Sequence, residues 1–144
     1  MSIANVLLTD DEKPFVETMT KRLNKRELDI IPAFSGEACL EALGKDGSIE
    51  VVILDVKMPG MDGIETLQKI KKKHPLVEVI MLTGHATIET GIEGMKMGAF
   101  DYLMKPCDIE ELVAKVMEAA GKKRQHEEKI VEARMKEITN RRAY

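Results

Sequence analysis

Five residues that could do chemistry stand directly after short apolar runs of this sequence. Asp10 and Asp11 follow the first run, Asp55 follows the third, Thr83 follows the fourth and Lys105 follows the fifth. If the runs are parallel strands of one sheet, their carboxyl ends meet at a single edge. Three carboxylates gathered there could not all stay ionised without a cation. Oxygen ligands in small number suit Mg²⁺ better than zinc, so the pattern predicts a magnesium site at that edge.

The same residues predict phosphoryl transfer to a carboxylate. Asp55, on the central third run, would be the nucleophile and would form an acyl phosphate. We expect Asp11, Asp55 and the backbone carbonyl of Lys57 to hold Mg²⁺, with Asp10 acting through water. These residues would neutralise the charge on the phosphoryl oxygens.

Each residue also has an ordinary structural interpretation. An Asp pair after a strand is usually a solvated turn or a helix cap, Thr83 could cap a helix, and Lys105 could be an exposed loop lysine. Their coincidence at matching strand ends favours function. In that reading Lys105 supplies positive charge and the Thr83 hydroxyl bonds to a phosphoryl oxygen.

Apolar runs that alternate with longer amphipathic stretches predict the elements that position these residues. The five strand candidates are Ile3–Thr9, Leu28–Ala33, Val51–Leu54, Val77–Leu82 and Phe100–Met104. The first, third and fourth are the most apolar, so we expect them at the centre of the sheet. The pattern predicts an α/β fold of five βα units, a doubly wound parallel sheet with helices on both faces.

Helix signals fill the gaps between the strand candidates. They are Pro14 in a first helical turn, Ser35 as the cap of Gly36–Lys45, Gly63 leading into Ile64–Lys73, Thr87 or Ala86 opening a segment to Met97 with Gly98 as its stop, and Asp108 as the cap of the last helix.

The last part of the chain differs in charge from the rest. Residues 121–144 carry eight basic and four acidic side chains, whereas the whole chain has a net charge of −3. A single helix over residues 108–144 would be ~55 Å long, but Gly121 would cost it ~1 kcal/mol and predicts a break. We therefore divide the chain into a domain, residues 1–120, and a charged helical linker or signalling helix, residues 121–144.

Length and composition exclude several classes of protein. The 144 residues suit one domain, and the 3% aromatic content leaves few stacking platforms for single-stranded nucleic acid. Cys39 and Cys107 lack a CxxC spacing and predict two reduced thiols. No run reaches ~20 apolar residues and the N-terminus lacks a signal-peptide pattern. We expect a cytoplasmic protein that binds neither membrane nor nucleic acid directly.

Four motifs resemble the receiver (CheY-like) domain of bacterial two-component response regulators. They are the Asp10-Asp11 pair, LDVKMPGMDG around Asp55, LTGHA at Thr83 and DYLMKP ending in Lys105-Pro106. The resemblance covers residues 1 to about 120. The segment LTGHATIETGIEGMKMGAFDYLMKP looks most like receivers of NtrC-type enhancer-binding activators.

The resemblance implies a fold, a partner and a bond geometry. The fold is a flavodoxin-like sheet with strand order 2-1-3-4-5, and the Lys105–Pro106 peptide is cis. The phosphate comes from a phosphohistidine on a sensor histidine kinase, with Mg²⁺ as cofactor. The chain is then a phospho-accepting switch that catalyses only its own phosphorylation and dephosphorylation.

The resemblance also implies how the switch works. Phosphate on Asp55 draws the Thr83 hydroxyl inward, and Tyr102 swings from outward to inward. The surface of the fourth helix, fifth strand and fifth helix then changes. Lys57 and His85 are the positions that tune the lifetime of the phosphoryl group, and Cys107 replaces the more common Phe.

Two other functions remain open from the sequence. A Mg²⁺-dependent phosphatase or phosphotransferase on a related sheet would need a second carboxylate two residues after Asp55, where Lys57 stands, and a substrate cap. A constitutive protein–protein module would leave the acidic site unused. For the leading hypothesis, homodimers could form through the switching surface or the C-terminal helix, although its apolar seam is thin. The chain would be a single-domain regulator or the N-terminal piece of a longer one.

Overall fold

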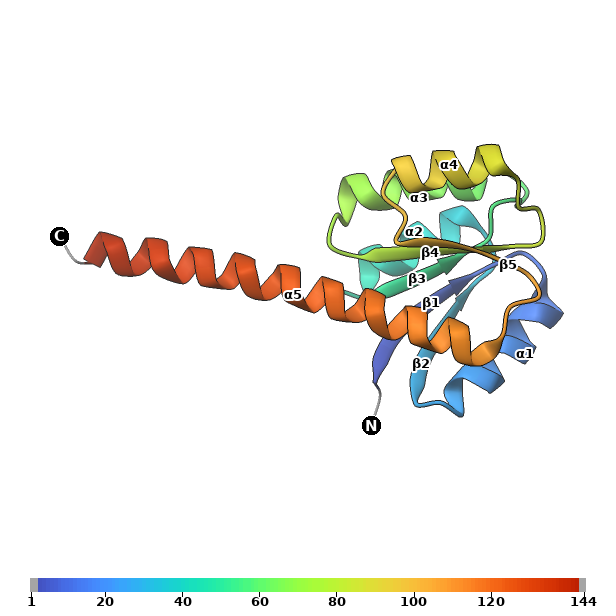
Figure 1. Ribbon diagram of the computed structural model, residues 1–144, viewed down its shortest axis with the longest axis horizontal. Helices are drawn as coiled ribbons and strands as arrows, with labels where there is room; N and C mark the ends of the chain where they lie inside the picture. Colours follow the sequence, from blue (N-terminus) through green and yellow to red (C-terminus); the bar gives the residue numbers. More distant parts are fainter. Residues whose placement is uncertain (1–2, 143–144) are drawn as a thin grey trace.

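The sheet of this protein has five parallel strands, shown by a computed structural model that describes residues 3–142 (Figure 1). Its strands are β1 (Ala4–Thr9), β2 (Leu28–Ala33), β3 (Val51–Leu54), β4 (Glu78–Thr83) and β5 (Asp101–Met104), in the order β2-β1-β3-β4-β5. The predicted strand order and the predicted central strands are confirmed. All residues of β3 and β4 are buried, whereas the edge strands β2 and β5 are partly exposed.

Five helices cover the two faces of this sheet. They are α1 (Lys13–Asn24), α2 (Gly36–Lys45), α3 (Gly63–Lys73), α4 (Ile88–Lys96) and α5 (Ile109–Arg142). Successive side chains of a strand point to opposite faces. Val6 and Leu8 therefore pack with α1 and α5, while Leu7 packs with α2 and α3. The chain folds around two apolar layers, one on each side of the sheet.

Several predicted boundaries were wrong by one residue. Strand β4 begins at Glu78 rather than Val77, because the Val77 N–H donates to the His74 carbonyl in a turn and the Glu78 N–H donates to the Glu50 carbonyl. Strands β1 and β5 begin one residue later than expected, and β4 ends at Thr83. Helix α3 begins at Gly63 because the Asp62 side chain caps it by accepting the Glu65 N–H.

The predicted helix break at Gly121 was also wrong. Helix α5 runs without interruption over 34 residues, which corresponds to ~51 Å. A glycine costs only ~1 kcal/mol inside a helix, and ion pairs of Lys122 and Arg124 with the sheet follow it at once. The second half of α5 projects away from the sheet as a single rod (Figure 1). None of the helices in residues 3–142 combines the length and apolarity needed to cross a membrane.

Candidate functional site: an acidic cluster at the carboxyl edge

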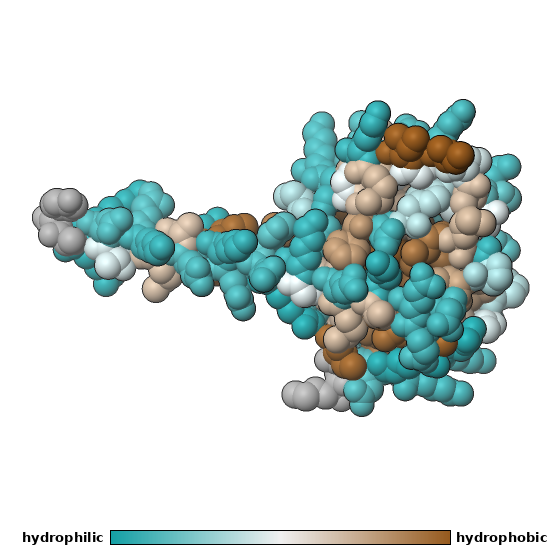
Figure 2. Space-filling view, in the orientation of Figure 1, coloured by the Kyte–Doolittle hydropathy of each residue, from teal (hydrophilic) through white to brown (hydrophobic). Residues whose placement is uncertain are grey.

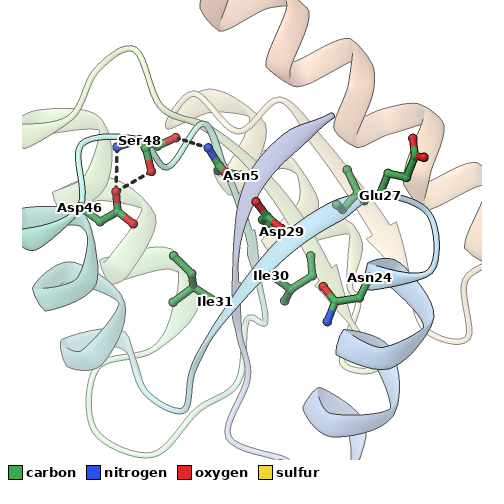
Figure 3. A pocket seen from close by; sticks show the side chains of 9 residues that line it. Asn5, Asn24, Glu27, Asp29, Ile30, Ile31, Asp46 and Ser48 are labelled. Carbon is green, nitrogen blue, oxygen red and sulfur yellow. Dashed lines mark hydrogen bonds between the residues drawn. The ribbon is translucent and has the colours of Figure 1, made fainter. Parts of the chain in front are cut away.

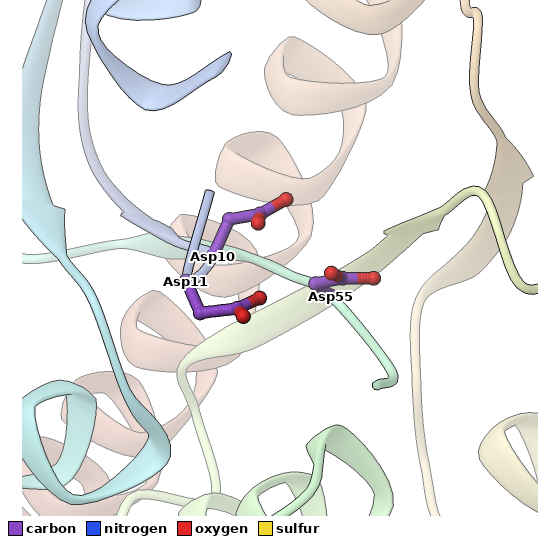
Figure 4. A group of neighbouring side chains, drawn as sticks. All are labelled: Asp10, Asp11 and Asp55. Atoms are coloured by element: carbon purple, nitrogen blue, oxygen red, sulfur yellow. The ribbon is translucent and has the colours of Figure 1, made fainter. Parts of the chain in front are cut away.

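Backbone pairing carries Asp10 and Asp55 just past the ends of neighbouring strands. The Asp10 N–H donates to the Ala33 carbonyl at 3.1 Å, and the Asp55 N–H donates to the Thr9 carbonyl at 3.0 Å. Both residues therefore continue the sheet's ladder and are held as firmly as strand residues. With Asp11 they place three carboxylate oxygens within 4.8 Å of one another (Figure 4).

The three carboxylates differ in solvent access and in hydrogen bonding. Asp10 and Asp55 are 1% and 2% exposed, whereas Asp11 is open to solvent. One oxygen of each buried carboxylate accepts a backbone N–H: Asp10 Oδ1 accepts that of Glu12 at 2.9 Å, and Asp55 Oδ1 accepts that of Val56 at 2.8 Å. The second oxygen of each, Oδ2, faces Lys105, at 2.6 Å from its Nζ for Asp10 and 3.9 Å for Asp55.

Lys105 provides the positive charge that faces this cluster. Its N–H donates to the Thr83 carbonyl at 2.9 Å, which fixes the residue beyond the end of β5, and the following Lys105–Pro106 peptide is cis. Its Nζ also lies 4.0 Å from the centre of the Phe15 ring and 3.5 Å from Glu12 Oε1. Sequence reasoning missed Phe15 and Glu12. A position next to the acidic pair could have suggested Glu12, but no local signal points to Phe15.

Burial and pairing act on the pKa values of this site in opposite directions. Burial raises the pKa of Asp10, and the hydrogen bond from Lys105 only partly offsets it. Burial lowers the pKa of Lys105, but the hydrogen bond to Asp10 and the charges of the surrounding carboxylates together outweigh that effect and leave the pKa raised. The Lys105 ammonium thus lies beside two of the three clustered carboxylates, and the excess negative charge at this half-buried site suits a divalent cation. The donor set of carboxylate oxygens fits Mg²⁺.

Thr83 and Tyr102 lie beside the cluster in different settings. The Thr83 side chain is buried, and its Oγ1 accepts the His85 N–H at 3.0 Å. The Tyr102 hydroxyl shares a hydrogen bond of 2.6 Å with Thr90 Oγ1 on α4, and its ring is half-buried against that helix. Tyr102 therefore contacts α4, while Thr83 stands at the edge of the sheet where the acidic cluster lies.

A shallow pocket opens on the acidic cluster. Its volume is about 490 Å³, and Asp11, Lys57 and His85 contribute to its lining. The two residues that the resemblance connects with phosphate lifetime therefore flank the exposed carboxylate. A larger hollow of about 910 Å³ lies along β2 (Figure 3), where the Ser48 N–H and hydroxyl donate to the Asp46 carboxylate. Its polar groups are partly bonded to one another, and we place the candidate site at the smaller pocket.

Gly63 lets α3 approach the backbone of Asp55. A Cβ atom on Gly63 would lie 2.0 Å from the Asp55 carbonyl oxygen, and the Gly63 N–H donates to the Val56 carbonyl at 2.7 Å. The sequence indicated Gly63 as the start of a helix, without this close approach to the backbone of Asp55. Its absent side chain is what allows the loop after β3 to close tightly around Asp55.

Comparison with known proteins agrees with this site. Residues 6–117 match the response regulator receiver domain family. The chain belongs to this family. It is 37% identical over 114 residues to the DNA-binding transcriptional regulator NtrC of Escherichia coli, and 34% identical over 115 residues to the transcriptional regulatory protein ZraR of the same species.

Solved structures show the same receiver fold. A receiver domain protein from Clostridium thermocellum is 35% identical, with a TM-score of 0.81 over 85% of this chain and 98% of that one. NtrX from Brucella abortus is 29% identical, with a TM-score of 0.79 over 89% of this chain and 29% of that one. The NtrC and ZraR matches cover 79% and 80% of this chain but only 24% and 26% of those proteins. This chain thus spans about a quarter of the length of these curated relatives.

Proposed function

We propose that this receiver accepts a phosphoryl group onto Asp55 from a phosphohistidine of a sensor histidine kinase. The observation that carries the proposal is the cluster itself: a buried carboxylate lies within 4.8 Å of two others and 3.9 Å from a lysine ammonium. Family membership supports a phospho-accepting switch rather than an enzyme that turns over external substrates. A cytoplasmic location and a cognate kinase are part of the proposal.

The transfer forms one bond and breaks one bond. The free Oδ2 of Asp55 attacks phosphorus, and the P–N bond to the donor imidazole breaks with its electron pair staying on nitrogen, which takes up a proton from solvent. Lys105 Nζ already faces Asp55 Oδ2 and pairs with the charge on the transferred group. Asp55 Oδ1 keeps its hydrogen bond from the Val56 N–H, which orients the carboxylate for attack.

Asp11, Asp55 and the Lys57 carbonyl would hold Mg²⁺, with Asp10 acting through water. When bound, the ion neutralises phosphoryl oxygens that would otherwise meet three carboxylates. Both oxygens of Asp10 are already engaged, Oδ1 by the Glu12 N–H and Oδ2 by Lys105. Asp10 therefore leaves the second oxygen of Asp55 open to the donor.

Thr83 and Tyr102 would change their contacts when Asp55 is phosphorylated. Added charge on Asp55 offers the Thr83 hydroxyl a stronger acceptor, so that Oγ1 turns from the His85 N–H toward a phosphoryl oxygen. The loop into α4 would follow, and the hydrogen bond between Tyr102 and Thr90 ties that helix to β5. The surface of α4, β5 and α5 would thus differ between the two states.

Two exposed apolar surfaces could pair copies of the chain or contact an output module. One lies on α4, where Ile88 is 84% exposed and Ile92 and Met95 lie on the same surface (Figure 2). The other is a stripe near the end of α5 formed by Val131, Met135 and Ile138, at coiled-coil spacing. We propose residues 1–120 as the receiver and residues 121–144 as its signalling helix.

The test of phosphorylation uses acetyl phosphate and Mg²⁺ with detection by mass spectrometry. We expect one hydroxylamine-labile phosphate on the wild type and none on Asp55→Asn. Asp46→Asn, the same change in the loop after α2, is the matched control and retains the adduct. A phosphorylated Asp55→Asn protein, or an unmodified wild type, would refute the proposal.

The test of pairing uses light scattering with and without beryllofluoride, which mimics the phosphoryl group. Met135→Gln removes an apolar residue from the α5 stripe, and Ile92→Gln removes one from the α4 surface. A change of mass with beryllofluoride that only one variant abolishes identifies the surface that pairs. If the mass change persists in both variants, neither surface forms the pair.

A further inference from the structure

A second acidic cluster lies at the amino edge of the sheet, opposite the phosphate site. Glu50 stands directly before β3 and Glu78 is the first residue of β4. Their side chains are only 13% and 2% exposed. Two carboxylates buried this far need positive partners. Helix α5 supplies two of them, Lys122 and Arg124, from the turn that follows its last buried residue, Ala120.

Arg124 holds Glu50 with both ends of its guanidinium. Arg124 Nε donates to Glu50 Oε2 at 2.6 Å and Nη2 donates to Oε1 at 3.0 Å. Nη2 also donates to the Ile3 carbonyl at 2.8 Å, and the Asn5 N–H donates to Glu50 Oε1 at 3.2 Å. Such bidentate pairs are strong and directional. The Glu50 carboxylate therefore joins α5 to the start of β1 and of β3.

Lys122 reaches Glu78 from the same part of α5. Its Nζ lies 3.6 Å from Glu78 Oε2 and 5.7 Å from the centre of the Phe100 ring. On the other side, Lys71 Nζ lies 3.7 Å from Glu78 Oε1, which has no hydrogen-bond partner among the described residues. Lys71 itself donates to the Pro75 and Val77 carbonyls. Lys122 thus adds an ion pair to the apolar packing of α5 on β4.

Beyond these contacts α5 leaves the body of the protein. Side chains 127–142 are all exposed. The ion pairs Lys123–Glu127 and Arg141–Glu137 join residues of α5 to each other and not to the body of the protein. Gly121, the weakest point of the helix, stands directly before Lys122. Without contacts beyond Gly121, the helix could bend there.

We propose that Glu50, Glu78, Lys122 and Arg124 form an ionic anchor that fixes the arm, residues 125–142, in one direction relative to the sheet. The arm then moves with the receiver body as one piece. When the buried part of α5 shifts, the stripe of Val131, Met135 and Ile138 therefore shifts with it. The inference deepens the proposed function, because it rests on that function for the arm's role in signalling.

The experiment measures the distance between arm and body in single molecules at picomolar concentration, where copies do not pair. Dyes on Thr139→Cys and Glu17→Cys, in a Cys107→Ser background, report this distance, since Cys39 is buried. We expect one narrow transfer-efficiency peak for the parent chain. In the double variant Lys122→Gln/Arg124→Gln the transfer-efficiency peak should be broader and shifted, because the helix can then bend at Gly121.

A second measurement and a matched control make the result decisive. Amide protection of residues 121–128 should fall about tenfold in the double variant, as expected for lost charged hydrogen bonds. Arg141→Gln removes an ion pair internal to the arm and should change neither observable. A double variant that matches Arg141→Gln in both would overturn the anchor. Acetyl phosphate labelling of the same variants reports separately on the proposed function, since the anchor is remote from Asp55.

Discussion

The two edges of this sheet both bury carboxylates, and they neutralise them differently. At the carboxyl edge the Lys105 ammonium lies beside Asp10 and Asp55, and Asp11 lies within 4.8 Å of both carboxylates. At the amino edge two glutamates meet three cationic side chains, those of Lys71, Lys122 and Arg124. The first edge therefore carries an excess of negative charge, and the second does not. This difference separates a site whose ligands suit an outside cation from one whose carboxylates are paired within the protein.

The first prediction concerns the space at a glycine on each edge. Gly63→Ala should lower the free energy of unfolding by ~3 kcal/mol, because the new Cβ would collide with the Asp55 carbonyl oxygen. Gly121→Ala should instead raise it by ~1 kcal/mol, because nothing lies within 4 Å and alanine favours helix. Urea denaturation measures both. Equal effects of the two substitutions would show that the carboxyl edge is not tightly closed.

The second prediction concerns the outside cation. Mg²⁺ at a hundred times its dissociation constant should stabilise the wild type by ~2.7 kcal/mol. Asp11→Asn should remove most of this gain, because it removes the charge of a proposed ligand. Glu78→Gln, a substitution at the amino edge, should leave the gain intact. Denaturation with Mg²⁺ and with a chelator checks this, and a Mg²⁺ effect that survives Asp11→Asn would place the ion elsewhere.

The third prediction compares how the loss of one carboxylate charge at each edge changes the free energy of unfolding of the metal-free protein. Glu50→Gln should lower the free energy of unfolding by ~1.5 kcal/mol, because it weakens charged hydrogen bonds to the half-exposed Arg124. Asp55→Asn should raise it by ~1 kcal/mol, because it relieves repulsion within the acidic cluster. Opposite signs in urea denaturation support the comparison of the edges. The same sign for both would mean that the edges are electrostatically alike.

Local patterns predicted much of the fold and of the acidic cluster. The bounds of β2, β3 and α2 were correct, because apolar runs and a Ser35 cap signal them directly. The aspartates could be grouped because the ends of parallel strands share an edge. The contacts of Lys105 with Phe15 and of Arg124 with Glu50 could not be predicted, since they join residues 90 and 74 positions apart. The Arg124–Glu50 pair, with the Lys122–Glu78 pair beside it, also explains why the expected break at Gly121 was wrong.

The last prediction concerns how the stability contributed by Glu50, at the amino edge, depends on pH. Burial raises the pKa of Glu50, but the hydrogen bonds from Arg124 and the Asn5 N–H, together with the charges of Arg124 and Lys123, outweigh it and hold the pKa below its ordinary value of 4.5. A carboxyl whose folded pKa is depressed stabilises the fold above its unfolded pKa and loses that contribution as pH falls through the folded value. The stability difference between wild type and Glu50→Gln should therefore be constant near neutrality and shrink below pH 4.5. Arg124→Gln should show the same convergence, whereas Arg141→Gln should run parallel to the wild type at every pH. A difference that persists in acid would mean that Glu50 acts through packing and not through its charge.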